Sequence, residues 1–447
     1  MKAFVSFPTC LSAVLFASLA LAQDAELPQI GPDQLAFSVE NMDKSTDPAV
    51  DFHRYAAGGW LDRVERPAEL AGISAFQYMS EKLKAQMKAA IASAGKEAAA
   101  APEGSAAKLI GTFYNAYMDI DARNAAGIEP IRDELDRIDG IETFDDLVRY
   151  VAHLSSIAGL PPLLALGPAA DLADSSHYAL YALGGSLSLD DKTRGLLGDP
   201  NDSERKQAYR HYIESVLRVA GYEAEPAASI SQTILALESE LYGDLLTKAE
   251  KVDPRSLYNP KTLAELQQQI PELNLELLLT EIGFEVPDRI ILTEPRYYKV
   301  LSKVLQEHPM EDIRDYLAFR VIDHYQGVLT TAFDGPARER AKLLTGVDTL
   351  RPREERFLAI AEANFGQLLG KLYVDHFFDE DTRQKALDMM RRIKAAFISR
   401  LPSRQWLSEA TRADALEKAE KLSYKGGILR TGLTMAAWRL GQIPLPT

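Results

Sequence analysis

The side chains best suited to metal binding or proton transfer near neutral pH are the seven histidines of this 447-residue chain. They are scattered singly along it, as His53, His153, His177, His211, His308, His324 and His376. A catalytic zinc is often held by His-Glu-x-x-His on a helix, because residues four apart share one face and can direct two imidazoles at one ion. The sequence lacks that motif. We therefore predict that this chain holds no catalytic residue and no metal ligand. The alternative is a metal site whose ligands are histidines far apart in the sequence. No substrate-binding residue is identified.

Other catalytic signatures are also absent from the sequence, namely the Gly-x-Ser-x-Gly elbow, the phosphate-binding glycine loop and the dinucleotide fingerprint. The carboxylate pairs Asp145-Asp146 and Asp190-Asp191 are expected to cap helices or face solvent rather than to act as acid and base. The aromatic run Phe113 to Tyr117 could be a substrate-binding strand, but its helical spacing predicts a place in the core.

The elements that would position these side chains are mainly helices. Apolar residues recur at three- and four-residue spacing in many stretches. These predicted helices are Ser80 to Ala94, Lys108 to Arg123, Ile131 to Ile138, Phe144 to Ala158, Ser203 to Ala220, Ser229 to Leu246, Thr262 to Gln269, Tyr297 to His308, Met310 to Ala332, Pro352 to His376, Asp381 to Leu401 and Ser408 to Lys421. Thr143 and Asp381 are the predicted caps of two of them.

Strands are predicted at few places. Alternating residues from Tyr178, followed by Gly184-Gly185 and Leu187-Ser188-Leu189, predict a small hairpin over Tyr178 to Leu189. A single strand is predicted at Arg289 to Leu292. The expected fold class is therefore mainly α, a large multi-helix domain with a small β-hairpin.

Composition limits the partners. The chain is 46% hydrophobic and 26% charged, typical of a globular protein, and is long enough for two or three domains or one large helical assembly. Its net charge of -15, without a cluster of Lys and Arg, argues against nucleic acid as a partner.

The first residues are typical of a signal peptide. Lys2 precedes an apolar stretch from Leu11 to Leu21, and Ala20-Leu21-Ala22 fits a cleavage site after Ala22. The stretch is too short to predict a membrane span, and the one cysteine, Cys10, lies within the segment removed. A thiol-free mature chain suits an oxidising compartment, so we expect a periplasmic or secreted protein. Residues 23–46 form a polar lead-in.

Several segments occur in the order found in one peptidase family. They are Asp47-Pro48, Asp51-Phe52-His53-Arg54-Tyr55, Gly58-Gly59-Trp60, Phe113-Tyr114-Asn115-Ala116-Tyr117-Met118-Asp119 with Gly127 and Pro130, Ala220-Gly221-Tyr222, Tyr258-Asn259-Pro260-Lys261-Thr262-Leu263, Leu368-Leu369-Gly370-Lys371-Leu372-Tyr373-Val374, and Trp406 with Thr411-Arg412 and Lys418-Ala419. In this colinear series the chain resembles the neprilysin family of zinc endopeptidases, peptidase family M13.

The resemblance implies a fold with two largely helical lobes around a chamber, one binding zinc and the other restricting entry to peptides. Residues 47–425 would be the N-terminal helical domain, and the family's His-Glu-x-x-His, third zinc ligand and transition-state histidine would follow later. It also implies that this chain binds no zinc and cleaves nothing by itself, that peptides are partners of the complete enzyme, and that an exposed lobe surface could self-associate. Gly72 and Gln77 stand where some relatives place an Arg and an Asp that grip the substrate, so that contact does not carry over.

Residues 426–447 depart from the family directly after Leu422-Ser423-Tyr424-Lys425. Relatives continue with a stretch like Gly-Tyr-Pro-x-x-Trp-x-Asp-Tyr-x-x-Leu. Codons for Gly427 to Trp438, read two bases out of frame, can encode those residues in order. We therefore hypothesise a frameshift in a gene for the whole peptidase, with a divergent tail as the alternative.

Three functions stay open from the sequence. The first is the non-catalytic N-terminal portion of a secreted zinc metalloendopeptidase. The second is a periplasmic peptide-binding or scaffold module that keeps only this lobe. The third is an intact enzyme with an unrecognised metal site, which the zinc content of the purified protein would separate from the other two.

Overall fold

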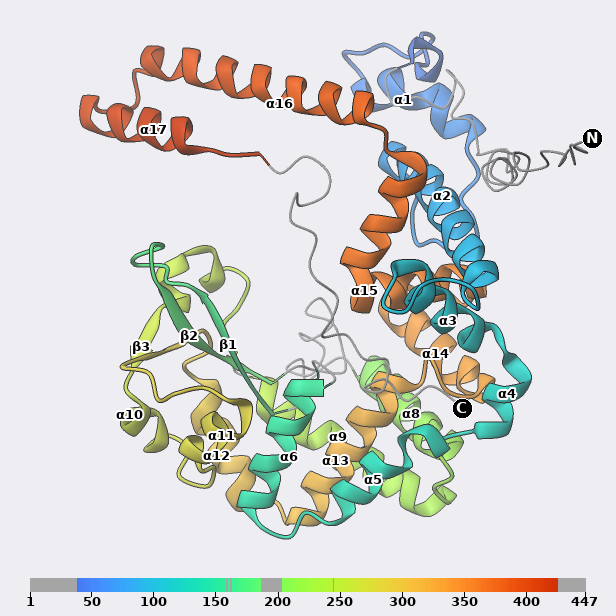
Figure 1. Cartoon of the computed structure of the whole chain (residues 1–447), viewed down its shortest axis with the longest axis vertical. Coiled ribbons are helices and arrows are strands. Elements are labelled where there is room, and N and C mark those ends of the chain that lie inside the picture. Colours follow the sequence, from blue (N-terminus) through green and yellow to red (C-terminus); the bar gives the residue numbers. More distant parts are fainter. Residues whose placement is uncertain (1–37, 158–159, 161–162, 186–202, 244, 425–447) are drawn as a thin grey trace, which may run out of the picture. The chain divides into compact units, whose positions relative to one another are not determined.

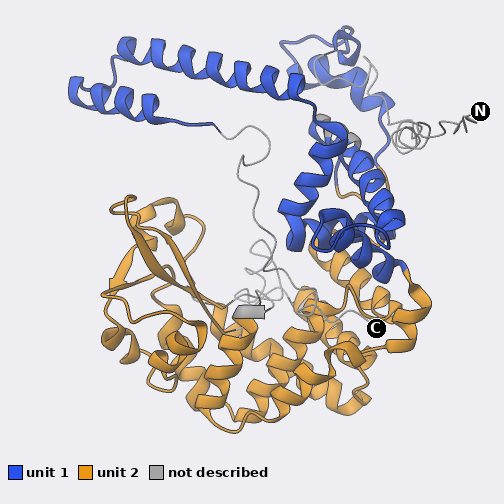
Figure 2. Cartoon of the chain, viewed as in Figure 1, with its two compact units in different colours: residues 1–66, 72–118, 352–439 blue, residues 67–71, 119–351, 440–447 orange. Residues whose placement is uncertain are grey.

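The computed structural model describes residues 38–157, 160, 163–185, 203–243 and 245–424, and these residues form two compact units (Figure 2). Unit 1 comprises 1–66, 72–118 and 352–439, and unit 2 comprises 67–71, 119–351 and 440–447. The predicted signal peptide, the predicted polar lead-in up to residue 37 and the residues from 425 onward lie outside the described residues. Within the described part, no helix has the length and apolarity needed to cross a membrane.

Unit 1 is helical (Figure 1). Its elements are η2 (Val39–Asn41), α1 (Phe52–Arg63), α2 (Ala75–Glu97), α3 (Ala106–Met118), α15 (Arg353–Phe377), α16 (Glu380–Arg400), η7 (Leu401–Ser403) and α17 (Glu409–Lys421). Helices α2, α3 and α15 pack together. The ring of Phe113 on α3 lies 5.1 Å from Phe357 and 5.4 Å from Phe365, both on α15.

The close approach of α2 and α3 depends on Gly111. A Cβ atom there would lie 2.1 Å from the carbonyl oxygen of Ala94, closer than two such atoms can stand. Only glycine lets the two backbones approach this closely in the middle of α3.

Unit 2 combines helices with one small sheet. Its elements are α4 (Ile120–Ala126), η3 (Glu129–Ile131), α5 (Arg132–Asp139), α6 (Phe144–Ile157), β1 (Leu164–Ala170), β2 (Tyr178–Gly184), α8 (Ser203–Val219), α9 (Ala224–Tyr242), η4 (Glu250–Val252), η5 (Pro254–Leu257), β3 (Asn259–Lys261), α10 (Leu263–Gln267), α11 (Leu275–Ile282), β4 (Ile290–Leu292), α12 (Tyr297–Glu307), α13 (Met310–Tyr325), η6 (Thr331–Phe333) and α14 (Asp334–Thr345). The mainly α fold class is confirmed.

The sheet has the strand order β1-β2-β4-β3 (Figure 1). β1 and β2 are antiparallel, with Leu164 opposite Gly184 and Ala170 opposite Tyr178. β2 runs parallel to β4, and β3 is antiparallel to β4. The predicted strands at Tyr178 and at Arg289 to Leu292 are therefore confirmed.

The antiparallel partner of β2 in the described residues is β1, which precedes it in sequence. The predicted second arm of the hairpin, Leu187 to Leu189, lies outside the described residues. β1 escaped prediction because Gly167 and Pro168 interrupt it, and both residues disfavour central strands. Proline is tolerated here because β1 is an edge strand.

The core of unit 2 is rich in buried tyrosines. The fully buried ones are Tyr209, Tyr212, Tyr297, Tyr298 and Tyr316. Two charged residues, Glu238 and Arg320, are also buried in this core. The Tyr209 hydroxyl donates to Glu238 at 2.5 Å, and Arg320 donates to the Tyr316 hydroxyl at 2.9 Å. Such pairing offsets the cost of removing charge from water.

Of the two predicted helix caps, Thr143 is confirmed and Asp381 is corrected. The Thr143 N–H donates to the Asp146 carboxylate at 3.0 Å, and the Asp146 N–H donates to the Thr143 hydroxyl at 3.2 Å, which closes the start of α6. The cap of α16 is Asp379, which accepts from the Thr382 N–H, so Asp381 lies in the first turn instead. Three acidic residues, Asp379 to Asp381, precede Thr382, and the first of them takes the cap.

Candidate functional site

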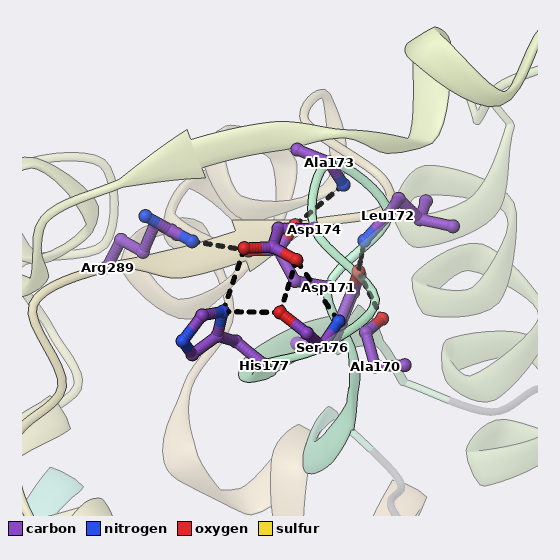
Figure 3. Close-up of polar contacts among 9 residues, drawn as sticks. Ala170, Asp171, Leu172, Ala173, Asp174, Ser176, His177 and Arg289 are labelled. Carbon is purple, nitrogen blue, oxygen red and sulfur yellow. Dashed lines mark hydrogen bonds and ion pairs between the residues drawn. The ribbon is translucent and has the colours of Figure 1, made fainter.

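The turn between β1 and β2 carries several polar side chains and lies beside the start of β4 (Figure 3). Asp171 closes β1 with a buried carboxylate. That carboxylate accepts the Ala173 N–H at 2.8 Å, forms an ion pair with Arg289 and accepts the Tyr258 hydroxyl. The backbone donor and then Arg289 hold the pKa of Asp171 down to about 2.

Such a carboxylate stays ionised and fully engaged at neutral pH, so it is unsuited to act as a general base. Its partners instead connect the β1–β2 turn to residues beside β3 and β4. We read Asp171 as the anchor of this turn.

The same turn brings together Asp174, Ser176 and His177, residue types that can form a catalytic triad (Figure 3). The Ser176 hydroxyl lies 2.6 Å from the Asp174 carboxylate and 3.1 Å from His177 Nδ1, and that Nδ1 lies 2.8 Å from the carboxylate. A triad needs serine at one imidazole nitrogen and aspartate at the other. Here both meet Nδ1, so the group caps an exposed turn and does not form a proton relay.

The other histidines meet separate partners. His153 Nε2 lies 3.1 Å from both Glu134 oxygens. His308 lies 3.1 Å from Asp312 and 3.3 Å from Glu240. Among the described residues, no three His, Cys, Asp or Glu side chains are grouped so that they could hold a metal ion. That this chain binds no zinc stays a prediction.

The remaining sequence candidates fall within ordinary structure. The aromatic run Phe113 to Tyr117 lies on α3, where Phe113 and Tyr117 are buried against α15, so the core interpretation is confirmed. Gly72 precedes α2, and Gln77 lies in the first turn of α2. Sequence reasoning missed Asp171 and Arg289; the only local signal was the Asp- and Ser-rich stretch after β1, which is typical of a turn.

Comparison with known proteins decides the family. The profile described as Peptidase family M13 matches residues 48–428. The chain belongs to peptidase family M13.

Relatives and solved structures agree with this membership. Endothelin-converting enzyme-like 1 of Homo sapiens is 26% identical over 445 residues, covering 93% of this chain and 56% of the relative. Neutral endopeptidase of Lactococcus lactis subsp. cremoris is 24% identical over 371 residues, covering 81% and 57%. The crystal structure of Mycobacterium tuberculosis zinc metalloprotease ZMP1 with inhibitor superposes with a TM-score of 0.76 at 25% identity, covering 87% and 58%. The chain thus spans little more than half of the relatives it matches.

Proposed function

We propose that this M13 chain is the N-terminal, substrate-restricting lobe of an exported zinc metalloendopeptidase that acts on peptides. The observation that carries the proposal is the family match over residues 48–428 in a chain without His-Glu-x-x-His. The structural likeness to a zinc metalloprotease supports it. A catalytic zinc needs three protein ligands held together, and no such group occurs within the part of the chain that the structure describes.

The complete enzyme would use zinc to activate water for peptide hydrolysis. This chain would contribute no ligand and no proton-transfer group to that step. Its part would be to shape the space that admits peptides, and alone it would be inactive.

Zinc content and peptide hydrolysis of the purified chain test the proposal together. We expect less than stoichiometric zinc and no chelator-sensitive cleavage of a mixed peptide library. One tightly bound zinc per chain, with cleavage abolished by EDTA, would instead establish an unrecognised metal site. Stoichiometric binding of peptides without cleavage would favour the peptide-binding or scaffold module.

A further inference from the structure

The exposed apolar side chains of the described residues are concentrated in unit 1. Twelve of the seventeen large apolar side chains that are exposed belong to it, although it has fewer described residues than unit 2. Single residues of this kind are ordinary on a protein surface, whereas a group of them marks a surface that another element covers. The uneven distribution indicates that unit 1 is the less complete of the two units.

Helix α16 carries the largest group of these side chains. Met389 is 63% exposed, Met390 41%, Ile393 63% and Phe397 52%, and no residue of α16 is buried. At 3.6 residues per turn, the four side chains fall within an arc of about 100°. An amphipathic helix of a globular protein normally turns such an arc towards a core. We call these four residues the α16 apolar face.

Within the described ranges, the main neighbours of α16 are α17 and η7 (Figure 1). Lys394, which lies outside the apolar face, donates to the carbonyl oxygens of Glu420 and Leu422, both at 2.8 Å. Its ammonium group also lies 5.7 Å from the centroid of the Tyr424 ring. The segment from α17 to Tyr424 therefore packs along another side of α16 and leaves the apolar face open.

The charge of α16 opposes the pairing of two copies of this face. The helix has six basic and three acidic residues, a net charge of +3 in a chain whose net charge is -15. Packed antiparallel about position 391, two copies would place Met390 opposite Arg392. Phe397 would lie opposite Lys385 in the same register. A covering segment with acidic side chains beside its apolar ones fits the face better, because it complements both features.

The relatives contain enough further chain to supply such a segment, because this chain spans little more than half of their length. In the proposed function, on which this docking site rests, the zinc-binding part of the peptidase follows the described residues. Residues 352–424 all belong to unit 1, so that part continues from the same unit that holds the open face.

We propose that the α16 apolar face is the surface on which the zinc-binding part of the peptidase packs, through an apolar segment flanked by acidic residues. Unit 1 and the zinc-binding part then share one core, while unit 2 keeps its own. In this chain alone the face is open to water, and in the complete peptidase it is buried.

Thiol labelling at position 393 tests the proposal in two proteins. One is the 447-residue chain, and the other is the product of the gene with its reading frame restored near Lys425 to Gly427; both carry Cys10→Ser and Ile393→Cys. A polyethylene glycol maleimide should modify the Ile393→Cys thiol at least about tenfold more slowly in the restored protein, because labelling then waits on local opening of the interface. Mass spectrometry of the peptide that contains position 393 measures the rate.

Val252→Cys is the matched control. Val252 is 80% exposed on η4 in unit 2, so its variant should react at the same rate in the two proteins. Equal reactivity of Ile393→Cys in the two proteins would overturn the proposal, and so would a gene that encodes no further part of the peptidase. Protection that appears in the 447-residue chain and grows with its concentration would show a homodimer and overturn it as well.

Zinc content and EDTA-sensitive cleavage of the restored protein separate docking on α16 from the proposed function. Zinc-dependent cleavage by a protein whose Ile393→Cys thiol stays reactive would exclude docking on α16 and leave the function standing. A protected thiol in a restored protein that binds no zinc would support docking and contradict the function.

Discussion

Arg123 on α4 donates a hydrogen bond to the carbonyl oxygen of Leu329, a residue 206 positions further along the chain. Its guanidinium also donates to Val328 at 3.0 Å and to Gly327 at 3.1 Å. Arg123 is 4% exposed, so one buried side chain satisfies three successive backbone acceptors beyond the end of α13. This fixes α4 to the segment between α13 and η6.

Replacing Arg123 by methionine should therefore destabilise unit 2. The variant keeps most of the side-chain volume but leaves buried carbonyl groups without this donor, at a cost of about 2–4 kcal/mol. Urea unfolding followed by tyrosine fluorescence measures the loss. Arg255→Met is the control, since that side chain is 91% exposed and should change stability by less than about 0.5 kcal/mol. Equal losses in the two variants would contradict the role of Arg123.

Gly111→Ala should destabilise unit 1 although alanine is the better helix former. The added methyl would meet the Ala94 carbonyl oxygen at 2.1 Å, which forces α2 and α3 apart and should cost about 2 kcal/mol or more. Gly370→Ala in α15 is the matched control, because nothing lies within 4 Å of its added Cβ. That variant should gain about 0.5–1 kcal/mol from helix propensity alone. Opposite signs in thermal unfolding are the expected result, and a stabilised Gly111→Ala would refute the close approach.

Asp315 on α13 should make the chain less stable as pH rises. Burial, followed by the charges of Glu311 and Asp312, raises its pKa from 3.8 to about 6. The folded state then holds this proton more tightly than the unfolded state, so stability is highest below about pH 4 and falls until about pH 6. Asp315→Asn removes the effect. It should be nearly neutral at pH 4 and stabilising by about 2 kcal/mol at pH 7.5, as measured by thermal unfolding.

Asp171 should have the opposite effect on the pH dependence of stability, which makes it a control for Asp315. Asp171 has a lowered pKa of about 2, so the stability it contributes is present above about pH 4 and is lost as pH falls towards 2. Asp171→Asn should therefore be destabilising at pH 7.5, with the opposite sign to Asp315→Asn. If both variants changed stability in the same direction, pairing and burial would not determine the pKa values of these two carboxyl groups.

Local patterns were sufficient for much of the helical fold. Apolar periodicity located α15 and α16 to within a few residues, although α15 is kinked at Phe365, whose backbone is not helical. The predicted helix from Met310 to Ala332 instead ends at Tyr325, and α14 was missed because Gly335-Pro336 is typical of a loop. Proline is compatible with a first helical turn, where its missing N–H has no partner to lose.

Long-range contacts were not predictable in this way. Asp171 and Arg289 are 118 residues apart, and nothing in the periodicity of either segment connects them. The contact between Arg123 and its three carbonyl acceptors was equally unpredictable, because a buried arginine and backbone carbonyl groups produce no periodic pattern in the sequence. The histidines could be recognised as isolated from spacing alone, whereas their carboxylate partners required the fold.

The nucleotide sequence that encodes residues 425–447 tests the frameshift hypothesis directly. The family match ends at residue 428, close to the point where the protein sequence departs from its relatives. If a frameshift near Lys425 to Gly427 causes that departure, then inserting or removing bases there should open a long reading frame containing His-Glu-x-x-His. Expression of the restored gene should yield a zinc-dependent peptidase that EDTA inactivates, since three protein ligands would then hold the ion. Substituting the glutamate of that motif should abolish cleavage while zinc remains bound, because this residue accepts the proton from the zinc-bound water. A stop codon soon after the restored frame, with no such motif downstream, would exclude the frameshift and favour a divergent tail.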